Sequence, residues 1–493
     1  MRRKKLYKKE NAAERSRHKE NYSRKKVTDK EGSLNMKKKE VLKEGELREF
    51  ISGILMIGLP VMVQTLLNSL VNMLDVFMVG QLGEVAITAA SLGNSWFFMY
   101  VLLIGGVTAA GSIFIAQYWG IRETEQIHKY MGIMFAGAGI IMMLFGLLSV
   151  FGSGFVIRIY SADPAVIEAG ARYIRIIGFS YFLFPVTNVY VTALRSTENT
   201  RVPMIGTLLS LVCNILFNYM LIFGHFGMPR MGVTGAAVAT LISRIAEFLF
   251  MTGYICIKKP PAAAGFKAYF SFGKKELKEY IRYGFFVILG EVIYAIGTSV
   301  YNIAYKYTGT LSQAALQIVN SLNNLAMVIG IGIGQSAGVI IGKLLGRNDL
   351  EKAKRFCRMY LIFAFLFSIL EGIMVIAFSP VFIDLFRIGE QSREYAEKMV
   401  WVLAFTLPFR AVNFTIVTGI LRSGGDSNYC FFANFCGTWM VGIPLAFLGA
   451  VVWKLPVYYV YLLIAGDEIS KFCICFPRAV RHKWMHNLTL SDT

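Results

Sequence analysis

A single carboxylate ends a polar stripe within an otherwise apolar segment of the chain. Asp75 is preceded by Asn72, Asn68 and Gln64 at intervals of three, four and four residues, so on a helix all four side chains project from one face. A carboxylate within hydrocarbon costs several kcal/mol and normally faces a bundle interior or a wet cavity. The pattern predicts a cation-coupling site at Asp75 with the three amides beside it. The alternative is that Asp75 lies near the outer headgroups and ends the helix.

Two further polar stripes have helical spacing, and another carboxylate lies in a later apolar segment. The second stripe is formed by Thr207, Ser210, Asn214 and Asn218. The third is formed by Gln313, Gln317, Asn320 and Asn324, and the segment before it holds Glu291. These side chains are interpreted either as the lining of a shared cavity or as interhelical hydrogen bonds within a membrane bundle. The cavity-lining candidates among them are Asn214, Asn218, Glu291 and Gln317.

The elements that carry these residues are long apolar runs. Of the 493 residues, 55% are apolar and 17% are charged, and the mean hydropathy is +0.52, which is outside the balance of a soluble domain. Runs of about 20 or more mainly apolar residues can each cross a bilayer. They predict an all-α integral membrane protein with twelve transmembrane helices. The predicted spans are residues 54–80, 88–117, 130–157, 172–194, 203–223, 233–257, 280–305, 312–341, 358–386, 399–421, 428–452 and 456–477.

The charges near the helix ends predict a topology. Residues 1–49 hold 18 Lys and Arg against 9 Asp and Glu and have no apolar periodicity, which predicts a basic, disordered tail. With that tail in the cytoplasm, Lys and Arg near the helix ends number 20 on the inner side and 9 on the outer side. The positive-inside rule then places both termini in the cytoplasm. We expect a multi-pass protein of the cell membrane.

An internal duplication divides the chain into two halves. With a shift of 226 residues, Gly58, Gly83 and Gly120 align with Gly284, Gly309 and Gly346, and with one more residue Leu194-Arg195-Ser196 aligns with Leu421-Arg422-Ser423. Copies with an even number of helices enter the membrane from the same side, which predicts a parallel repeat. The predicted parts are six-helix lobes at residues 50–257 and 279–477, a cytoplasmic linker at 258–278 and a cytoplasmic tail at 478–493.

Other residues at membrane depth have a structural interpretation beside any functional one. Pro60 lies within the first span, where proline removes a backbone hydrogen bond. It is predicted to form either a bend point that takes part in transport or a static kink. Asp467-Glu468-Lys471 is interpreted as a self-neutralising helical group, and Arg410 is expected to snorkel. Glu371 is a further isolated charge in an apolar span.

Motifs for enzymatic or ATP-driven chemistry are missing from the sequence. The seven cysteines include no CxxC pair, so we predict no disulfide or metal role for them. No glycine stands five residues before the glycine of either Gly-Lys pair, which excludes a Walker A motif. We therefore predict a non-enzyme with no cofactor, no metal and no ATP. The expected partners are a small molecule and membrane lipid, without nucleic acid, and a monomer is expected.

Four motifs stand out together within residues 50–480. They are Pro60 through Asp75 into Val79-Gly80-Gln81-Leu82-Gly83, Leu194-Arg195-Ser196 with Asn199 and Pro203, Gly232 through Thr240, and Leu421 through Asp426. Jointly these segments resemble a known family, the multidrug and toxic compound extrusion (MATE) transporters. The resemblance implies efflux of organic, often cationic, amphipathic compounds in exchange for H⁺ or Na⁺. It also implies a central cavity between two six-helix lobes.

The site residues of the family carry over position by position. Asp75 matches the helix 1 carboxylate that is taken to bind the coupling cation, and Pro60 matches the proline at which that helix is thought to bend. Asn188 and Asn214 look like the polar partners of that carboxylate. At Asn218 one branch of the family has a second aspartate, so this chain departs from it. The departure favours proton capture by Asp75 alone over a Na⁺ site.

We therefore predict a secondary active antiporter. With Asp75 ionised, the cavity attracts a lipophilic cation; proton binding neutralises Asp75, and the first helix rearranges about Pro60. Glu291 resembles a glutamate of another branch, but it lies about one turn earlier. The alternatives are a flippase of lipid-linked precursors or polysaccharide from the same superfamily, and a non-transporting membrane receptor.

Overall fold

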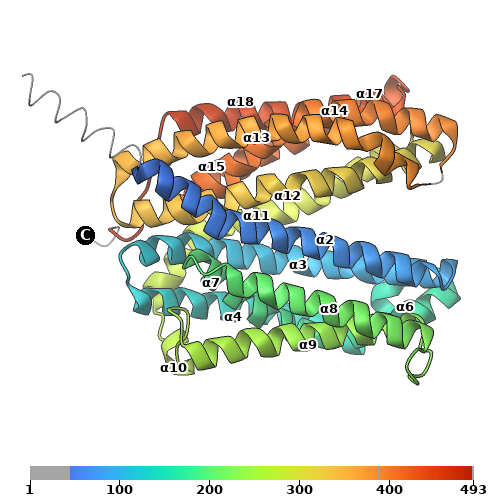
Figure 1. Cartoon of the computed structure of the whole chain (residues 1–493), viewed down its shortest axis with the longest axis horizontal. Helices are drawn as coiled ribbons and strands as arrows, with labels where there is room; N and C mark the ends of the chain where they lie inside the picture. Colours follow the sequence, from blue (N-terminus) through green and yellow to red (C-terminus); the bar gives the residue numbers. More distant parts are fainter. Residues whose placement is uncertain (1–44, 387, 491–493) are drawn as a thin grey trace, which may run out of the picture. The chain divides into compact units, whose positions relative to one another are not determined.

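The computed structural model of the chain describes residues 45–386 and 388–490, which form helices and loops and no strand (Figure 1). The predicted all-α fold is confirmed. Most of the predicted basic tail lies outside the described residues, but residues 45–49 are helical, contrary to prediction. Glu, Leu and Arg favour helix, so this charged stretch can be helical without an apolar face. The described residues from Ile54 onward form one compact unit.

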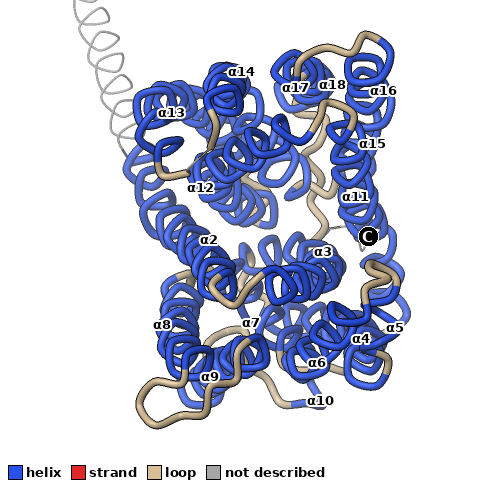
Figure 2. Tube along the Cα trace, turned by 90° about the vertical axis from the view of Figure 1, so that its right-hand side faces the viewer, coloured by secondary structure: helices blue, strands red, loops and turns tan. Residues whose placement is uncertain are grey.

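The first half of the unit is a bundle of helices that begins with a single π-helical turn. Its elements are η1 (Ile54–Gly58), α2 (Leu59–Gly80), α3 (Glu84–Gly120), α4 (Thr124–Phe151), α5 (Ser153–Arg158), α6 (Pro164–Tyr181), α7 (Phe184–Ser196), α8 (Arg201–Phe223) and α9 (Val233–Lys258). The predicted linker contains one short helix that the sequence did not indicate, α10 (Phe266–Tyr269). Figure 2 shows these helices together in the lower half of the view.

The second half forms a separate group in the upper half of Figure 2. Its elements are α11 (Lys274–Lys306), α12 (Thr310–Gly346), α13 (Leu350–Asp384), α14 (Glu390–Phe414), η2 (Thr415–Leu421), α15 (Ser427–Phe435), η3 (Cys436–Gly442), α16 (Ile443–Phe447), η4 (Leu448–Val452), α17 (Val457–Ile464) and α18 (Gly466–Val480). The π-helical segments η2, η3 and η4 interrupt its α-helices. Such wide turns are uncommon and occur frequently at functional sites.

Ten helices in the described chain are long and apolar enough to cross a membrane. The helices α6 and α7 pass the same test only together and meet at a bend of 45°, so the number of spans is eleven if this pair is one broken span. Pro185 stands in the first turn of α7, where it cannot donate a hydrogen bond back into α6. The predicted span at residues 456–477 corresponds to α17 and α18, which have 8 and 15 residues. Neither is long enough alone to cross a bilayer core of about 30 Å, so the twelfth crossing stays a prediction.

The two halves are related as the duplication predicts. Gly83 and Gly309 directly precede α3 and α12, and their φ angles are 102° and 95°, a region in which L-residues are strained. The first long helix of each half packs against the second helix of the other half, α2 against α12 and α11 against α3. Such an exchange of equivalent contacts is the result of a two-fold relation between repeats.

Where α3 and α12 approach each other, their backbones touch through two glycines. A Cβ atom at Gly346 would lie 1.9 Å from the carbonyl oxygen of Gln117, and one at Gly120 would lie 2.3 Å from that of Lys343. Gln117 and Lys343 are also related by the shift of 226 residues, so the contact is reciprocal. A side chain at either glycine would therefore separate the two halves.

We predict that Gly346→Val destabilises the folded protein by about 1–3 kcal/mol, the usual cost of overpacking. Its side chain meets rigid backbone, so the helices must shift. The matched control is Gly139→Val in α4, where a Cβ meets nothing within 4 Å and the loss of glycine is the same. Thermal unfolding of both purified variants in detergent tests the prediction. Equal unfolding midpoints in the two variants would contradict it.

Candidate functional site

The stripe that ends at Asp75 faces a cavity of about 370 Å³ inside the first half. Gln64, Asn68, Asn72 and Asp75 all line it from α2. Gln64 is buried, whereas Asn68 and Asn72 are more exposed. The cavity is also lined by α3 and by α6 to α9, which supply two other predicted residues, Asn188 and Asn214.

Asp75 is held by neutral amides. The Asn218 Nδ2 group donates a hydrogen bond to Asp75 Oδ1 and another, of 3.0 Å, to Asn214 Oδ1. Asn214 in turn donates to the Thr240 hydroxyl at 3.4 Å. Asn218 is fully buried and lies behind the cavity wall rather than in it. Within the described residues Asp75 forms no ion pair, so its direct partners are neutral amides.

Three charged residues of this cavity were not among the predicted site residues. They are Arg195, Arg244 and Glu247. Arg244 Nη1 lies 2.9 Å from Glu247 Oε2, so these two charges offset each other. This cavity therefore contains a second carboxylate, Glu247, besides Asp75. A sequence signal existed in the spacing of Arg244 and Glu247, which is that of an i, i+3 pair.

Pro60 stands at the start of α2, directly after the π-helical turn η1. Proline has no N–H group, so it cannot donate to the carbonyl oxygen of Met56 four residues earlier. The hydroxyl of Thr200 donates to that oxygen instead. The interruption of the helix is thus compensated by a side chain outside it.

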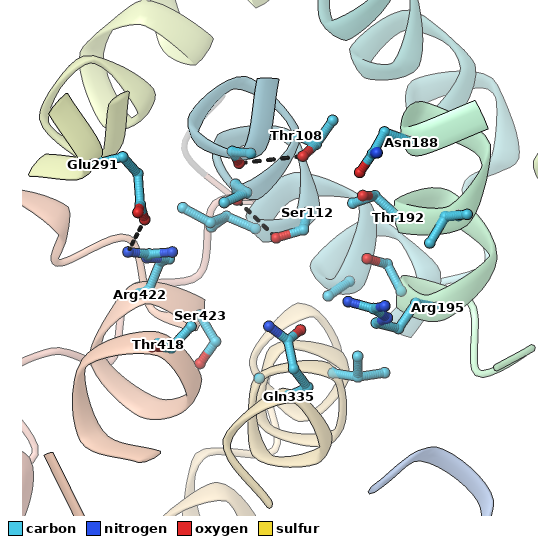
Figure 3. A pocket seen from close by; sticks show the side chains of 18 of the residues that line it. Thr108, Ser112, Asn188, Thr192, Arg195, Glu291, Gln335, Thr418, Arg422 and Ser423 are labelled. Carbon is cyan, nitrogen blue, oxygen red and sulfur yellow. Dashed lines mark hydrogen bonds and ion pairs between the residues drawn. The ribbon is translucent and has the colours of Figure 1, made fainter. Parts of the chain in front are cut away.

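A second cavity of about 370 Å³ lies between the two halves. Figure 3 shows polar side chains converging on it from α3, α7, α11, α12, η2 and the residues after η2. They are Thr108, Ser112, Asn188, Thr192, Arg195, Glu291, Gln335, Thr418, Arg422 and Ser423. Asn188 and Arg195 also line the first cavity. The two cavities therefore adjoin at α7.

A third cavity of about 260 Å³ lies in the second half and shares Glu291 and Arg422 with the central one. Glu291 Oε1 is 3.3 Å from Arg422 Nη2. Arg410 lines this cavity and donates to Asn323 Oδ1 at 2.6 Å, so it does not snorkel as predicted; an inward partner is available to it. Gln317 is exposed and lines none of the three cavities, contrary to prediction.

The predicted group Asp467-Glu468-Lys471 forms an ion-paired cluster in α18. Lys471 Nζ lies 2.8 Å from Asp467 Oδ1 and 3.8 Å from Glu468 Oε1. The Tyr301 hydroxyl donates to Asp467 Oδ2 at 2.9 Å. Tyr301 occupies the position of Asp75 in the second repeat, and Asp467 occupies that of Thr240. The carboxylate beside Tyr301 is thus supplied by the last helix, whereas Glu291 of α11 pairs with Arg422.

One end of the central cavity is closed by contacts between the halves. Lys343 Nζ lies 2.6 Å from Glu198 Oε1, and Trp119 Nε1 donates to Glu198 Oε2 at 3.0 Å. Burial opposes ionisation of Glu198, but these two hydrogen bonds and the positive charges of Lys343 and Arg122 together outweigh it and hold the pKa of Glu198 below its ordinary value of 4.5. A lowered carboxylate pKa stabilises the fold above that value and ceases to do so as the pH falls below it.

The end of the chain reinforces this closure. The Leu488 N–H group donates to Gln117 Oε1 at 2.7 Å, and Gln117 Nε2 donates to the Ser423 carbonyl at 2.8 Å. Arg347 Nε donates to the Gly120 carbonyl at 2.8 Å. Both halves are therefore joined at this end by neutral and charged hydrogen bonds.

Membrane-crossing helices in two repeated halves, with adjoining polar cavities closed at one end, have the architecture of a membrane transporter. The chain belongs to the MatE family, whose model matches residues 60–220 and 278–448.

Relatives and solved structures agree with this assignment. The probable multidrug resistance protein NorM of Thermotoga maritima is 25% identical over 457 residues, which cover 92% of this chain and 97% of that protein. The probable multidrug resistance protein YoeA of Bacillus subtilis is 24% identical over 409 residues, or 82% and 88% of the two chains. An outward-facing multidrug resistance MATE family transporter of the MOP superfamily has the same fold, with TM-score 0.80, 19% identity and coverage of 88% and 95%. The resemblance to MATE transporters is confirmed, and these relatives lend no support to a receptor.

We predict that the charges of Glu198 and Lys343 stabilise the closed end jointly. Glu198→Lys and Lys343→Glu should each destabilise the protein, because each places like charges together. The double variant should recover part of the loss, with a coupling energy of about 0.5–3 kcal/mol. Unfolding of the single and double variants at pH 7 measures this coupling. Strictly additive effects would contradict a direct interaction.

Proposed function

We propose that this transporter is a cation-coupled antiporter that exports small organic compounds, with Asp75 as the group that exchanges a proton. The observation that carries the proposal is the setting of Asp75. It lines a cavity of about 370 Å³ in the first half and forms no ion pair within the described chain. An uncompensated carboxylate at membrane depth is costly, and binding of a proton or another cation removes that cost.

The charges around Asp75 favour H⁺ over Na⁺ as the coupling ion. Glu247 lines the same cavity, but its charge is offset by Arg244. A cation at Asp75 would thus meet one unpaired negative charge and neutral amides. A proton needs only that one carboxylate, whereas a metal cation binds best to several oxygen ligands of a shaped site. Na⁺ remains the alternative coupling ion, with amide oxygens of Asn68 and Asn72 as its candidate ligands.

Neutralisation of Asp75 is proposed to move α2 about Pro60. Asp75 and Gln64 face the same cavity from α2, so a change at Asp75 acts on the helix whose first turn contains Pro60. The carbonyl of Met56, which Pro60 cannot bond, accepts a hydrogen bond from the Thr200 hydroxyl. Exchange of that contact lets the helix bend without an unsatisfied carbonyl group. The protein is proposed to act in the cell membrane with both termini in the cytoplasm.

A flippase of lipid-linked precursors remains a second candidate because Arg195 and Arg422 line the central cavity. Such precursors carry phosphate, which arginine binds well. Proteoliposomes separate the two candidates. Antiport of a soluble organic compound produces a pH change that depends on that compound, whereas lipid flipping requires no soluble substrate.

We predict that Asp75→Asn abolishes transport driven by a pH gradient, because the variant cannot exchange a proton at neutral pH. Substrate-dependent pH change in proteoliposomes should fall to that of empty vesicles. The matched control is Glu371→Gln, because Glu371 is a buried carboxylate that lines none of the three cavities. This variant should retain proton-coupled transport. Undiminished proton-coupled transport by Asp75→Asn would overturn the role of Asp75. Transport by the parent protein that follows a Na⁺ gradient instead would identify the other coupling ion.

We predict that Pro60→Ala slows transport several-fold without lowering stability. Alanine supplies an N–H group for the Met56 carbonyl and removes the ring that interrupts the helix, so the straight form of α2 gains stability. The unfolding midpoint and the initial transport rate are measured on the same preparation. A lower midpoint together with lower transport would indicate damage to the fold rather than loss of a bend point.

A further inference from the structure

Two arginines occupy equivalent positions of the duplication and face the same central cavity. Arg195 and Arg422 come from the repeated Leu-Arg-Ser segments, and Figure 3 shows them on opposite sides of the cavity. Each is held by the first long helix of its own half. Arg195 Nη2 donates to Gln64 Oε1 at 2.9 Å, and Arg422 Nη2 lies 3.3 Å from Glu291 Oε1. Arg195 also lines the cavity of the first half, and Arg422 also lines the cavity of the second half.

The two positions differ in how their charge is balanced. Glu291 offsets the charge of Arg422, but Gln64 is neutral and offsets no charge of Arg195. The amide of Gln64 also donates to the Thr207 hydroxyl at 2.9 Å, which fixes its oxygen toward Arg195. No carboxylate pairs with Arg195 anywhere in the described part of the chain. The wall near Arg195 therefore carries an uncompensated positive charge within the membrane bundle, which is costly unless an anion binds there.

Polar groups beside Arg195 are available to a ligand. Asn188 and Thr192 precede Arg195 by seven and three residues on α7, so the three share one helical face. Gln335 reaches the same cavity from α12, as Figure 3 shows. Among the described residues, the side chains of Asn188, Thr192 and Gln335 have no hydrogen-bond partner. They can therefore donate to a second oxygen of an anionic group that Arg195 binds.

Negative charge is present on the other sides of the same space. Glu291 lies across the central cavity from Arg195 in Figure 3, with its side chain 27% exposed. Asp75 lies in the adjoining cavity, of which Arg195 is also part. The walls between these groups include Val101, Val339 and Phe414. A ligand that spans this space would meet a cation at one point, a carboxylate at another and apolar side chains between them.

We propose that Arg195 is the anion-binding group of the substrate site. It takes the carboxylate of a zwitterionic amphipathic molecule whose amine faces Glu291 or Asp75. The inference rests on the proposed function and names the substrate class of that same site. Guanidinium binds carboxylate through two parallel, charge-assisted hydrogen bonds, and a cavity of about 370 Å³ is within the range of small-molecule sites. A purely cationic ligand would leave Arg195 uncompensated, and a purely anionic one would leave Asp75 without an opposite charge.

The contact between Gln64 and Arg195 also links the anion-binding group to the proton-exchanging one. Gln64 and Asp75 lie on the same face of α2, and Gln64 is the residue that orients Arg195. A rearrangement of α2 therefore changes the orientation of Arg195. Movement of α2 thus couples protonation of Asp75 to release of the ligand's carboxylate from Arg195.

The test uses two probes that differ in one group. One is a fluorescent aromatic amino acid amphiphile with a free carboxylate, and the other is its methyl ester with the same amine. Equilibrium binding to the purified full-length protein gives the ratio of their affinities without any ion gradient. We expect the parent protein to prefer the acid by about tenfold or more, the effect of a charge-assisted hydrogen-bonded pair. Arg195→Gln should reduce this ratio to near one, and Arg195→Lys should retain part of it.

Arg201→Gln is the matched control, because Arg201 is exposed at the start of α8 and lines none of the three cavities. Its ratio should equal that of the parent protein. An unchanged ratio in Arg195→Gln, or equal losses of affinity for both probes, overturns the inference. A ratio near one in the parent protein also overturns it. Transport of neither probe under a pH gradient counts against the proposed function instead, since the binding ratio is measured independently of transport.

Discussion

The cost of an unbalanced charge in hydrocarbon is the constraint on which the arrangement of this protein depends. Each ionised side chain within the bundle must face a cavity, an opposite charge or a set of hydrogen-bond donors. Arg244 and Glu247 satisfy this requirement as a pair, and Lys471 satisfies it with Asp467. Asp75 and Arg195 satisfy it only through amides and water-accessible space. Among the groups that line the cavities, these two can consequently gain most from a bound cation and a bound anion.

The duplication shows how the same backbone can hold different charges. Glycines at equivalent positions keep the two halves in reciprocal contact, as Gly120 and Gly346 do. The polar residues are not under this steric constraint, and they differ between equivalent positions of the two halves. Tyr301 stands where the first half has Asp75, and its hydroxyl binds a carboxylate of α18 that has no counterpart in α9. The second half thus carries a carboxylate that is already paired, whereas that of the first half is available for exchange.

Helical spacing was sufficient to predict the cavity face of α2, because residues at intervals of three and four must share a side of a helix. It also located the long apolar spans and the repeat. Spacing could not show which neighbour a stripe faces, and Gln317 accordingly lies on an exposed side of α12. Nor could it find the contact between Asn218 and Asp75, which are 143 residues apart. Arg195 was visible only as part of a repeated motif, because its partner Gln64 lies 131 residues away.

The balance of charge limits how the proposed proton exchange can work. The cavity of the first half contains Asp75, Glu247, Arg195 and Arg244, and it is formally neutral when Asp75 is ionised. Protonation of Asp75 leaves one excess positive charge, which expels the amine of a bound zwitterion but strengthens the hold of Arg195 on its carboxylate. A proton alone would therefore not release such a ligand. Release therefore also needs a movement of α2, the helix that carries both Asp75 and Gln64, and a bend at Pro60 is proposed to contribute to that movement.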